Sequence, residues 1–310
     1  MSKMYRLFNR IIFQLFSLYP NDFLADRVKL RSEDGFFYIM LLTLESKAKL
    51  NNGVEIPYLG LWVYQSPPGE ITLHAVRYAL KIGYRHIDTA ELYGNEMDVD
   101  RALLESGIRR DDVFITTKVW NSHQGYDSTL YACERSLRRL GLSYVELYLI
   151  HWPVQGLGDE TWRVMIKLLR QSKARAIGVS NYSVSQINEL LKNSDVVPAV
   201  NQVEFHPFLY QEELLGFCKN NKIQLEAYSP LTRGKRLNHP NILDLAKKYD
   251  KTPAQILIRW SLQHNVIVIP KSIHEARIKE NSQVFDFQLE SKDMKVLNSL
   301  NENLSTVFLD

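Results

Sequence analysis

Cysteine is scarce in this chain of 310 residues, which has only Cys133 and Cys218. A small domain held together by disulfides needs more cysteines, and structural zinc sites need closely spaced pairs. Both residues fall in stretches with helical patterning, so we expect two reduced thiols in the core. Reduced thiols are typical of a reducing compartment, and the sequence therefore predicts a cytoplasmic protein.

Long apolar runs and an excess of one charge are also missing. No run approaches the roughly 20 residues that a membrane-spanning helix needs, and the formal net charge is only +3. Lysine and arginine nowhere cluster densely enough to follow a phosphate backbone. We therefore expect neither a membrane nor a nucleic-acid partner. The composition is otherwise that of an ordinary globular protein.

The first 43 residues differ from the rest and are predicted to be an N-terminal extension before a single domain over residues 44–310. Three basic residues and no acidic ones precede a short apolar stretch at 11–19. That order loosely resembles a targeting peptide, but no small-residue cleavage site follows. Two other interpretations are favoured. The extension is a disordered tail or surface helix, or translation begins at Met40 and residues 1–39 are a start-site artefact.

From residue 48 onward, strand-like and helix-like segments alternate. Asn52 and Gly53 separate two short β-rich segments, and Asn-Gly supplies the positive φ angles of a tight hairpin turn. Eight apolar, β-rich segments follow, at residues 58–64, 84–88, 113–118, 145–151, 174–179, 199–204, 223–228 and 266–270. Helical patterns separate them, and Thr252 with Gln255 predicts a capping box before the eighth. Eight such units over roughly 230 residues predict an α/β fold, a (β/α)₈ TIM barrel.

A doubly wound sheet is the competing α/β architecture. It would need a phosphate-binding Gly-x-Gly-x-x-Gly after its first strand, and the sequence contains no such motif. A P-loop, a His-Glu-x-x-His motif and zinc-like cysteine pairs are absent as well. The barrel is therefore favoured, and no metal site is predicted.

Polar residues stand where the predicted strands end, which is where a barrel of this kind carries its chemistry. They are Asp88 and Tyr93 after the second strand, Lys118 and Trp120 at the third, His151 and Trp152 at the fourth, Ser180 and Asn181 at the fifth, Gln202 in the sixth, Tyr228 and Ser229 at the seventh, and Lys271 and Ser272 at the eighth. One polar strand end means little, but a ring of them is the pattern of a site.

Three segments around this ring resemble the signatures of the aldo-keto reductase family. Residues 83–96 read GYRHIDTAELYGNE, residues 173–182 read KARAIGVSNY, and residues 269–272 read IPKS, followed by Arg277, Glu280 and Asn281. The resemblance runs from about residue 48 to residue 303. It implies a TIM barrel whose base is closed by an N-terminal β-hairpin, and NAD(P)H-dependent reduction of an aldehyde or ketone.

The resemblance implies four catalytic residues. Reduction of a carbonyl leaves an oxygen that must receive a proton, and the implied general acid is Tyr93. Lys118 is the implied cation that lowers the pKa of this phenol, and Asp88 holds the lysine in place. His151 is implied to donate a hydrogen bond to the substrate oxygen. Taken singly, Asp88 is also compatible with a helix cap and Tyr93 with a rim aromatic, but lysine is seldom buried without a partner.

The same resemblance implies the residues that hold the cofactor. Ser180, Asn181 and Gln202 surround the nicotinamide amide, and Tyr228 stacks on the nicotinamide ring. Ser229 and Leu231 lie along the pyrophosphate, Lys271, Ser272 and Arg277 hold the adenosine 2′-phosphate, and Glu280 and Asn281 contact the adenine. Two cations and a hydroxyl suit a dianionic phosphate, which favours NADPH over NADH. The alternative for the cations is a solvated basic face, and use of both cofactors stays open.

Tyr64, Trp120 and Trp152 are predicted to wall the substrate pocket. The connection after Leu231 and the segment after Leu300 are short, whereas in the family these segments extend over large hydrophobic substrates. Their brevity resembles the prokaryotic-type branch that includes 2,5-diketogluconate and methylglyoxal reductases. We therefore expect small aldehydes, 2-oxoaldehydes or ketones as substrates, and a monomer, which is common in this family.

Trp62 departs from the family pattern, which has a glycine at this place in the first strand. By strand alternation Trp62 shares a face with Tyr64, toward the barrel mouth and the nicotinamide. A glycine there would permit close approach of the backbone to the cofactor. The alternative function is therefore a catalytically weak or inactive barrel that binds a dinucleotide.

Overall fold

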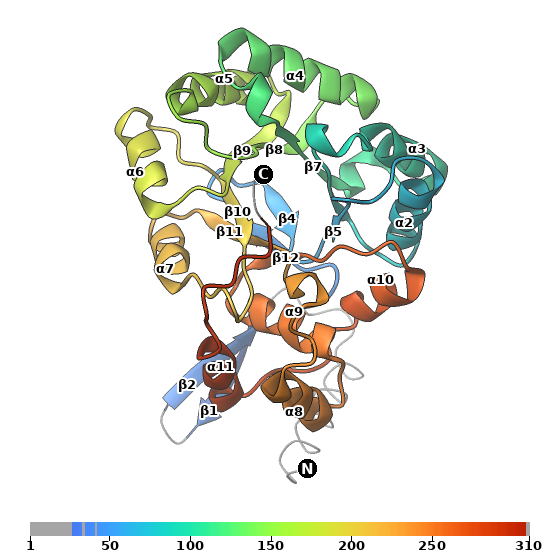
Figure 1. Ribbon diagram of the computed structural model, residues 1–310, viewed down its shortest axis with the longest axis vertical. Helices are drawn as coiled ribbons and strands as arrows, with labels where there is room; N and C mark the ends of the chain where they lie inside the picture. Colours follow the sequence, from blue (N-terminus) through green and yellow to red (C-terminus); the bar gives the residue numbers. More distant parts are fainter. Residues whose placement is uncertain (1–26, 33–34, 41, 308–310) are drawn as a thin grey trace.

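The computed structural model describes residues 27–32, 35–40 and 42–307, and its centre is an eight-stranded parallel sheet (Figure 1). The order of the strands is β12-β11-β10-β9-β8-β7-β6-β5. They are β5 (Leu61–Trp62), β6 (His86–Asp88), β7 (Phe114–Val119), β8 (Val145–Ile150), β9 (Ala174–Ser180), β10 (Val200–Glu204), β11 (Gln224–Tyr228) and β12 (Ile267–Ile269). Each strand coincides with one of the eight predicted segments, except that β7 and β9 each extend one residue further, so the predicted strand positions are confirmed.

Two bridges close this sheet into a barrel. Leu59 pairs in parallel with Val268, and Trp62 pairs in the same way with Lys271. These pairs join the first strand to the last, because they lie beside β5 and β12. The backbone N–H of Gly60 adds a hydrogen bond of 2.9 Å to the Val268 carbonyl. The predicted (β/α)₈ barrel is therefore confirmed.

Helices surround the barrel, and most of them lie between consecutive strands (Figure 1). They are α2 (Glu70–Lys81), α3 (Glu96–Ser106), α4 (Tyr126–Arg139), α5 (Gly158–Arg170), α6 (Val184–Lys192), α7 (Glu212–Asn220), α8 (Pro240–Tyr249), α9 (Pro253–Gln263), α10 (Glu275–Ser282) and α11 (Ser291–Asn298). The predicted capping box begins α9. There the Thr252 side chain accepts from the Gln255 backbone and the Gln255 side chain accepts from the Thr252 backbone.

A short antiparallel hairpin covers the amino ends of the barrel strands. Its strands are β3 (Lys47–Lys49) and β4 (Glu55–Pro57). In its turn, the Asn51 side chain donates to the Pro198 carbonyl at 3.1 Å, and the Asn52 side chain donates to the Arg175 carbonyl at 2.9 Å. Both acceptors lie where β9 and β10 begin, so the predicted closure of the barrel base is confirmed.

A second hairpin lies in the N-terminal extension. Strand β1 (Arg27–Ser32) pairs antiparallel with β2 (Gly35–Met40). For this part of the extension, a hairpin takes the place of the expected disordered tail or surface helix. The aromatic and β-branched run at 36–39 explains it, because such residues favour strands over helices. The rest of that prediction, for residues 1–26, lies outside the described residues.

The two cysteines are free and buried, Cys133 in α4 and Cys218 in α7, as the sequence predicted. Among the helices of the described residues, none is long and apolar enough to cross a membrane.

Candidate active site

The carboxyl ends of the barrel strands surround a pocket of about 210 Å³. It is lined by Trp62, Tyr64, Leu92, Tyr93, Trp120, His151, Trp152, Ser180, Asn181, Gln202, Tyr228 and Val307. All of these residues except Leu92 and Val307 stand among the residues singled out from the sequence. Aromatic rings with a few convergent polar groups are the usual composition of a small-molecule site.

Asp88, Lys118 and Tyr93 form one hydrogen-bonded group at this pocket. The side chain of Lys118, in β7, is fully buried, and its ammonium donates to Asp88 Oδ1 at 2.5 Å and to the Tyr93 hydroxyl at 3.3 Å. Asp88 is the last residue of β6, and Tyr93 ends the short 3₁₀ helix that follows it. The ammonium also donates to the Thr89 carbonyl at 2.9 Å. These partners explain how a lysine is tolerated in the core, where an unpaired charge is very costly.

Burial dominates the pKa values of this group. It raises the pKa of the Tyr93 phenol well above its usual value of 10.0, and the charge of Asp88 adds to the rise, whereas a hydrogen bond from Trp62 opposes it. Burial also lowers the pKa of Lys118 and raises that of Asp88, while their mutual attraction opposes both changes. The lowering of the Tyr93 pKa expected from the sequence does not occur in this structure, where burial and then the charge of Asp88 raise it.

His151 directly follows β8, and its ring lies beside the Tyr93 ring. Its ring meets those of Tyr93 and Trp120 edge to face, with centroids 5.6 and 5.1 Å apart. Burial, and then the charge of Lys118, lowers the pKa of His151 well below 6.5. The imidazole is therefore neutral at neutral pH. Its Nδ1 is buried and has no hydrogen-bond partner in the described structure.

Gln202 is tied to two buried carboxyl groups. Its side-chain nitrogen donates to Asp88 Oδ2 and to Glu226 Oε2, each at 2.8 Å. Both N–H groups are thereby used, which leaves the side-chain oxygen to contact a ligand. Burial, and then the charge of Asp88, raises the pKa of Glu226 to about 8. Glu226 was not among the predicted site residues, although an acidic residue inside an apolar strand segment is the signal that marks it.

Hydrogen bonds link Ser180, Asn181 and Tyr228 to one another elsewhere in the pocket lining. The Asn181 side chain donates to the Ser180 hydroxyl at 3.0 Å, and the Tyr228 hydroxyl donates to Asn181 Oδ1 at 2.8 Å. Asn181 has a φ of 65°, in the left-handed region that asparagine tolerates better than most residues. These contacts fix the Tyr228 ring at the end of β11.

The other predicted cofactor residues do not line this pocket but come from the segments after β11 and β12 and from α10. Ser229 is buried, and its hydroxyl has no partner among the residues that the structure describes. Leu231 and Lys271 are half-buried, Ser272 and Asn281 are buried, Arg277 is exposed, and Glu280 accepts a hydrogen bond of 2.5 Å from Thr252. Burial and the charge of Arg233 lower the pKa of Lys271, as expected of a cation without a carboxylate to balance it. A lysine in this state and an unpartnered buried hydroxyl fit a phosphate-bearing cofactor.

The indole of Trp62 lies inside the pocket. Its N–H donates to the Tyr93 hydroxyl at 2.9 Å. The ring stacks on Tyr64, with centroids 4.9 Å apart and 19° between the planes, and lies tilted against Tyr228 at 5.3 Å. Trp62 and Tyr64 therefore do share a face, as the strand pattern predicted.

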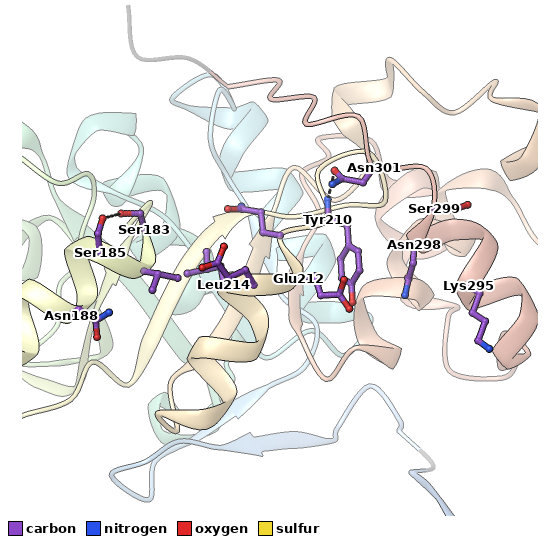
Figure 2. Close-up of a pocket in the computed structure, with 13 residues that line it drawn as sticks. Ser183, Ser185, Asn188, Tyr210, Glu212, Leu214, Lys295, Asn298, Ser299 and Asn301 are labelled. Atoms are coloured by element: carbon purple, nitrogen blue, oxygen red, sulfur yellow. Dashed lines mark hydrogen bonds between the residues drawn. The ribbon is translucent and has the colours of Figure 1, made fainter.

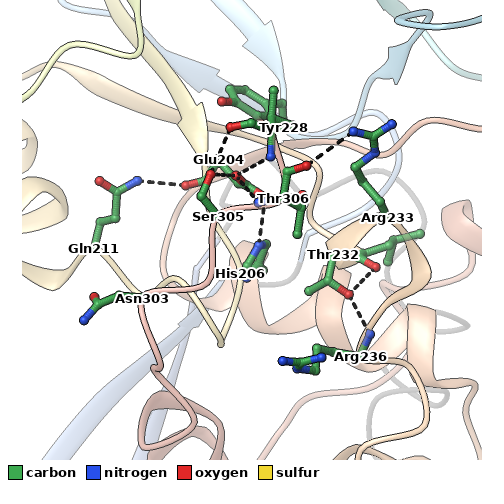
Figure 3. A network of polar contacts seen from close by, with 12 residues as sticks. Glu204, His206, Gln211, Tyr228, Thr232, Arg233, Arg236, Asn303, Ser305 and Thr306 are labelled. Carbon is green, nitrogen blue, oxygen red and sulfur yellow. Dashed lines mark hydrogen bonds and ion pairs between the residues drawn. The ribbon is translucent and has the colours of Figure 1, made fainter. Parts of the chain in front are cut away.

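Glu204 fastens the segment 304–307 (the C-terminal strap) beside the pocket (Figure 3). Its carboxylate accepts hydrogen bonds from the backbone N–H of Thr306, at 2.9 Å to each oxygen, from the Thr306 hydroxyl, and from the Ser305 hydroxyl at 2.9 Å. Val307 is thereby held in the pocket wall, where it packs against the cluster of Trp62 and Tyr228. The sequence analysis missed this contact, for which the acidic residue in the sixth strand segment was again the available signal.

A larger hollow of about 1050 Å³ lies elsewhere, between α6, α7 and α11 (Figure 2). Side chains such as Ser183, Tyr210 and Asn298 line it, and it contains none of the predicted site residues. Within the described residues, no group of three or more His, Cys, Asp or Glu side chains is arranged to hold a metal ion.

Known proteins are similar in sequence to this chain over most of its length. The model of the aldo/keto reductase family matches residues 58–302. An uncharacterized oxidoreductase of Bacillus subtilis, YtbE, is 50% identical over 269 residues, which cover 86% of this chain and 96% of that protein. The glyoxal reductase of the same organism is 49% identical over 264 residues, or 85% of this chain and 96% of that one.

Solved structures share the barrel as well. MGS-M4, an aldo-keto reductase enzyme from a deep-sea metagenome library, is 44% identical with a TM-score of 0.82, covering 86% of this chain and 98% of its own. A Bombyx mori aldo-keto reductase in complex with NADP is 35% identical with a TM-score of 0.81, covering 86% and 96%. Sequence and barrel agree, and the chain belongs to the aldo/keto reductase family of NAD(P)H-dependent oxidoreductases.

Proposed function

We propose that this chain reduces small aldehydes, 2-oxoaldehydes or ketones to alcohols with NADPH, using Tyr93 as the proton donor. The observation that carries the proposal is the contact of the Tyr93 hydroxyl with the buried Lys118–Asp88 ion pair at the edge of an aromatic pocket. A buried ion pair beside a phenol is costly to build and is typical of a site where a proton is transferred.

Each of the four groups has a distinct task in this proposal. The raised pKa of Tyr93 keeps its phenol protonated at neutral pH, so that a proton is available for the carbonyl oxygen. Lys118 stabilises the phenolate that this transfer leaves behind, and Asp88 holds the ammonium in place. His151, being neutral, donates a hydrogen bond that orients the carbonyl oxygen.

NADPH is the favoured cofactor, and NADH is proposed to bind more weakly. When bound, NADPH supplies the hydride that the carbonyl carbon accepts, and it is released as NADP⁺. Lys271, Ser272 and Arg277 suit the 2′-phosphate that NADH lacks. Ser180, Asn181 and Gln202 offer groups for the carboxamide and Tyr228 a ring for the nicotinamide, while Ser229, Leu231, Glu280 and Asn281 are proposed to contact the pyrophosphate and adenine.

Compact substrates are favoured by the size of the pocket. About 210 Å³ between Tyr64, Trp120 and Trp152 accommodates small carbonyls rather than bulky ones. The 49% identity with a protein named glyoxal reductase supports 2-oxoaldehydes within this class. The two free, buried cysteines support a reducing compartment, and we propose the cytoplasm.

A second function is favoured by Trp62 alone. The indole N–H engages the hydroxyl of the proposed proton donor, and the ring fills part of the pocket. On this alternative the chain is a barrel that binds the dinucleotide but turns over slowly or not at all.

Oxidation of NADPH in the presence of methylglyoxal, diacetyl, an aromatic aldehyde and a keto-sugar acid tests the proposal. The wild-type protein is expected to turn over at least one of them, with NADPH preferred to NADH. Tyr93→Phe should abolish turnover and leave NADPH affinity nearly unchanged, whereas Tyr131→Phe, an exposed position on α4, should change neither. Equal turnover by Tyr93→Phe contradicts the assigned role, and silence of the wild type despite NADPH binding favours the alternative.

A further inference from the structure

Trp62 stands at the end of β5 with its indole enclosed by aromatic rings. The side chain is only 6% exposed although it lies at the barrel mouth. One ring face is covered by Tyr64, and Tyr228 lies tilted against the indole with its centroid at 5.3 Å. Val307 of the C-terminal strap packs against the same cluster. The indole is therefore an ordered part of the pocket and not a loose surface ring.

The polar edge of the indole is equally well satisfied. Its N–H donates to the Tyr93 hydroxyl at 2.9 Å, while the Lys118 ammonium donates to the same oxygen at 3.3 Å. A phenol oxygen offers two acceptor positions. Both are filled from within the chain, one of them by Trp62.

The contacts of Trp62 bear on ligand binding because its indole lies against the Tyr228 ring. Tyr228 is 5% exposed, and its hydroxyl is fixed by Asn181 at 2.8 Å, so the ring cannot easily turn away. The Trp62 indole lies against this ring at an angle of 37°, and both side chains line the pocket. A flat heteroaromatic ring that stacks on Tyr228 from the pocket would meet the indole, because two rings cannot occupy one stacking position.

We infer that the Trp62 indole occupies the stacking position on Tyr228 that the nicotinamide ring needs, so that Trp62 sets the affinity for the nicotinamide half of the cofactor. The inference rests on the proposed use of NADP(H). Only the fraction of molecules in which the indole has left Tyr228 can bind the nicotinamide ring. The apparent dissociation constant equals the intrinsic one divided by that fraction. The adenosine phosphate half would bind at the side chains of Lys271 and Arg277, neither of which lines the pocket that holds the indole, although Lys271 pairs with Trp62 through the backbone. Its binding is therefore expected to change little.

Isothermal titration calorimetry with two ligands separates these halves. The ligands are NADP⁺ and adenosine 2′,5′-bisphosphate, which carries the adenine and the 2′-phosphate but no nicotinamide. Trp62→Gly is expected to tighten NADP⁺ binding by about 10- to 100-fold and to leave binding of the bisphosphate unchanged. Trp62→Phe keeps a stacking ring but removes the N–H, and its NADP⁺ affinity should fall between the other two.

Tryptophan fluorescence gives a second readout that needs no turnover. NADP⁺ should change the emission of the wild-type protein as the indole leaves Tyr228, and Trp62→Phe should lose that component. A melting curve for each variant identifies any that is unfolded. If Trp62→Gly is unfolded, the comparison of the wild-type protein with Trp62→Phe carries the test.

Two results are distinguishable. Equal NADP⁺ affinity in the wild type, Trp62→Gly and Trp62→Phe, with normal bisphosphate binding, overturns the inference and leaves the proposed cofactor standing. Failure of every folded variant to bind either ligand overturns the proposed cofactor, and the inference with it.

Discussion

Replacing Glu204 with glutamine is expected to release the C-terminal strap from the pocket wall. The carboxylate is buried, at 4% exposure, and collects donors from the strap and from His206 (Figure 3). Glutamine has nearly the same size, so the barrel itself should remain intact. The change instead places an –NH₂ group where one carboxylate oxygen accepts hydrogen bonds.

The size of the effect follows from the donors at Oε2. This oxygen accepts from the Ser305 hydroxyl at 2.9 Å, the Thr306 N–H at 2.9 Å and the Val307 N–H at 3.4 Å. A hydrogen bond to a charged group contributes about 1.5–3 kcal/mol and a neutral one about 0.5–1.5 kcal/mol. The Ser305 and Val307 bonds are lost, at about 1 kcal/mol each, and the Thr306 N–H keeps its bond to Oε1 but meets a neutral acceptor, at a cost of about 1 kcal/mol, which gives about 3 kcal/mol in total. The open fraction of the strap should then rise roughly 100-fold.

Amide hydrogen exchange of the peptide that contains the strap measures this opening. The Thr306 and Val307 amides should exchange roughly 100-fold faster in Glu204→Gln, since each tenfold corresponds to about 1.4 kcal/mol. Glu302→Gln is the matched control, because Glu302 forms an exposed pair with Arg236 that is worth little. Unchanged exchange in Glu204→Gln, measured beside this control, would refute the assignment of the carboxylate as the anchor.

Acid should release the strap of the wild-type protein as well. Burial alone would raise the pKa of Glu204, but hydrogen bonds from His206, Thr306 and Ser305 outweigh it and hold the pKa below its usual value of 4.5. A carboxyl with a lowered folded pKa contributes stability that is present above the unfolded pKa and is lost as pH falls through the folded one. After correction for the intrinsic exchange rate, which itself falls with pH, the protection of the strap amides should therefore decrease below pH 4.5, and this decrease should be absent in Glu204→Gln.

Three further predictions concern the barrel. Gly178→Ala should lower the melting temperature by several degrees, because the new Cβ would lie 2.5 Å from a carbonyl of the adjacent strand. The matched change Gly216→Ala, in α7, places a Cβ that meets nothing within 4 Å and should stabilise the protein slightly. Burial raises the pKa of Cys133 to about 12 and that of Cys218 to about 11. Neither thiol should therefore react with a thiol reagent at pH 8 before the protein unfolds. Rapid modification of the native protein would contradict this. The pKa of Glu226, raised to about 8, implies that its contribution to stability declines as pH rises from 4.5 to 8. The melting temperature of Glu226→Gln should therefore fall less than that of the wild type over this range, and parallel curves would show that Glu226 does not titrate there.

The barrel could be predicted from the sequence because its signals are local. An apolar segment of five to seven residues bounded by polar ones indicates a buried strand wherever it occurs. Asp88, Lys118 and His151 could be singled out for the same reason, since each stands at the end of such a segment. Because the carboxyl ends of the parallel strands lie at one rim of the barrel, these three residues are predicted to lie close together even though the sequence gives no distances.

Contacts that depend on burial at long range could not be predicted in this way. An acidic residue in an apolar strand segment marks Glu204 and Glu226 as unusual, but only the fold shows that the strap lies at the first and Gln202 at the second. The pKa of Tyr93 is a similar case. Its proximity to Lys118 was predictable from the family pattern, but the direction of the pKa shift depends on how much water the surrounding rings exclude.

Most buried polar groups in proteins have hydrogen-bond partners, whether or not a ligand is present. At two places in this pocket the chain supplies them, since the Tyr93 hydroxyl accepts the indole N–H of Trp62 and the Asn181 side chain accepts the hydroxyl of Tyr228. A ligand that reaches these groups exchanges one contact for another, and its affinity is the difference between the two. For this reason, removing the internal partner in Trp62→Gly should tighten binding of the cofactor even though the substitution deletes contacts from the folded chain.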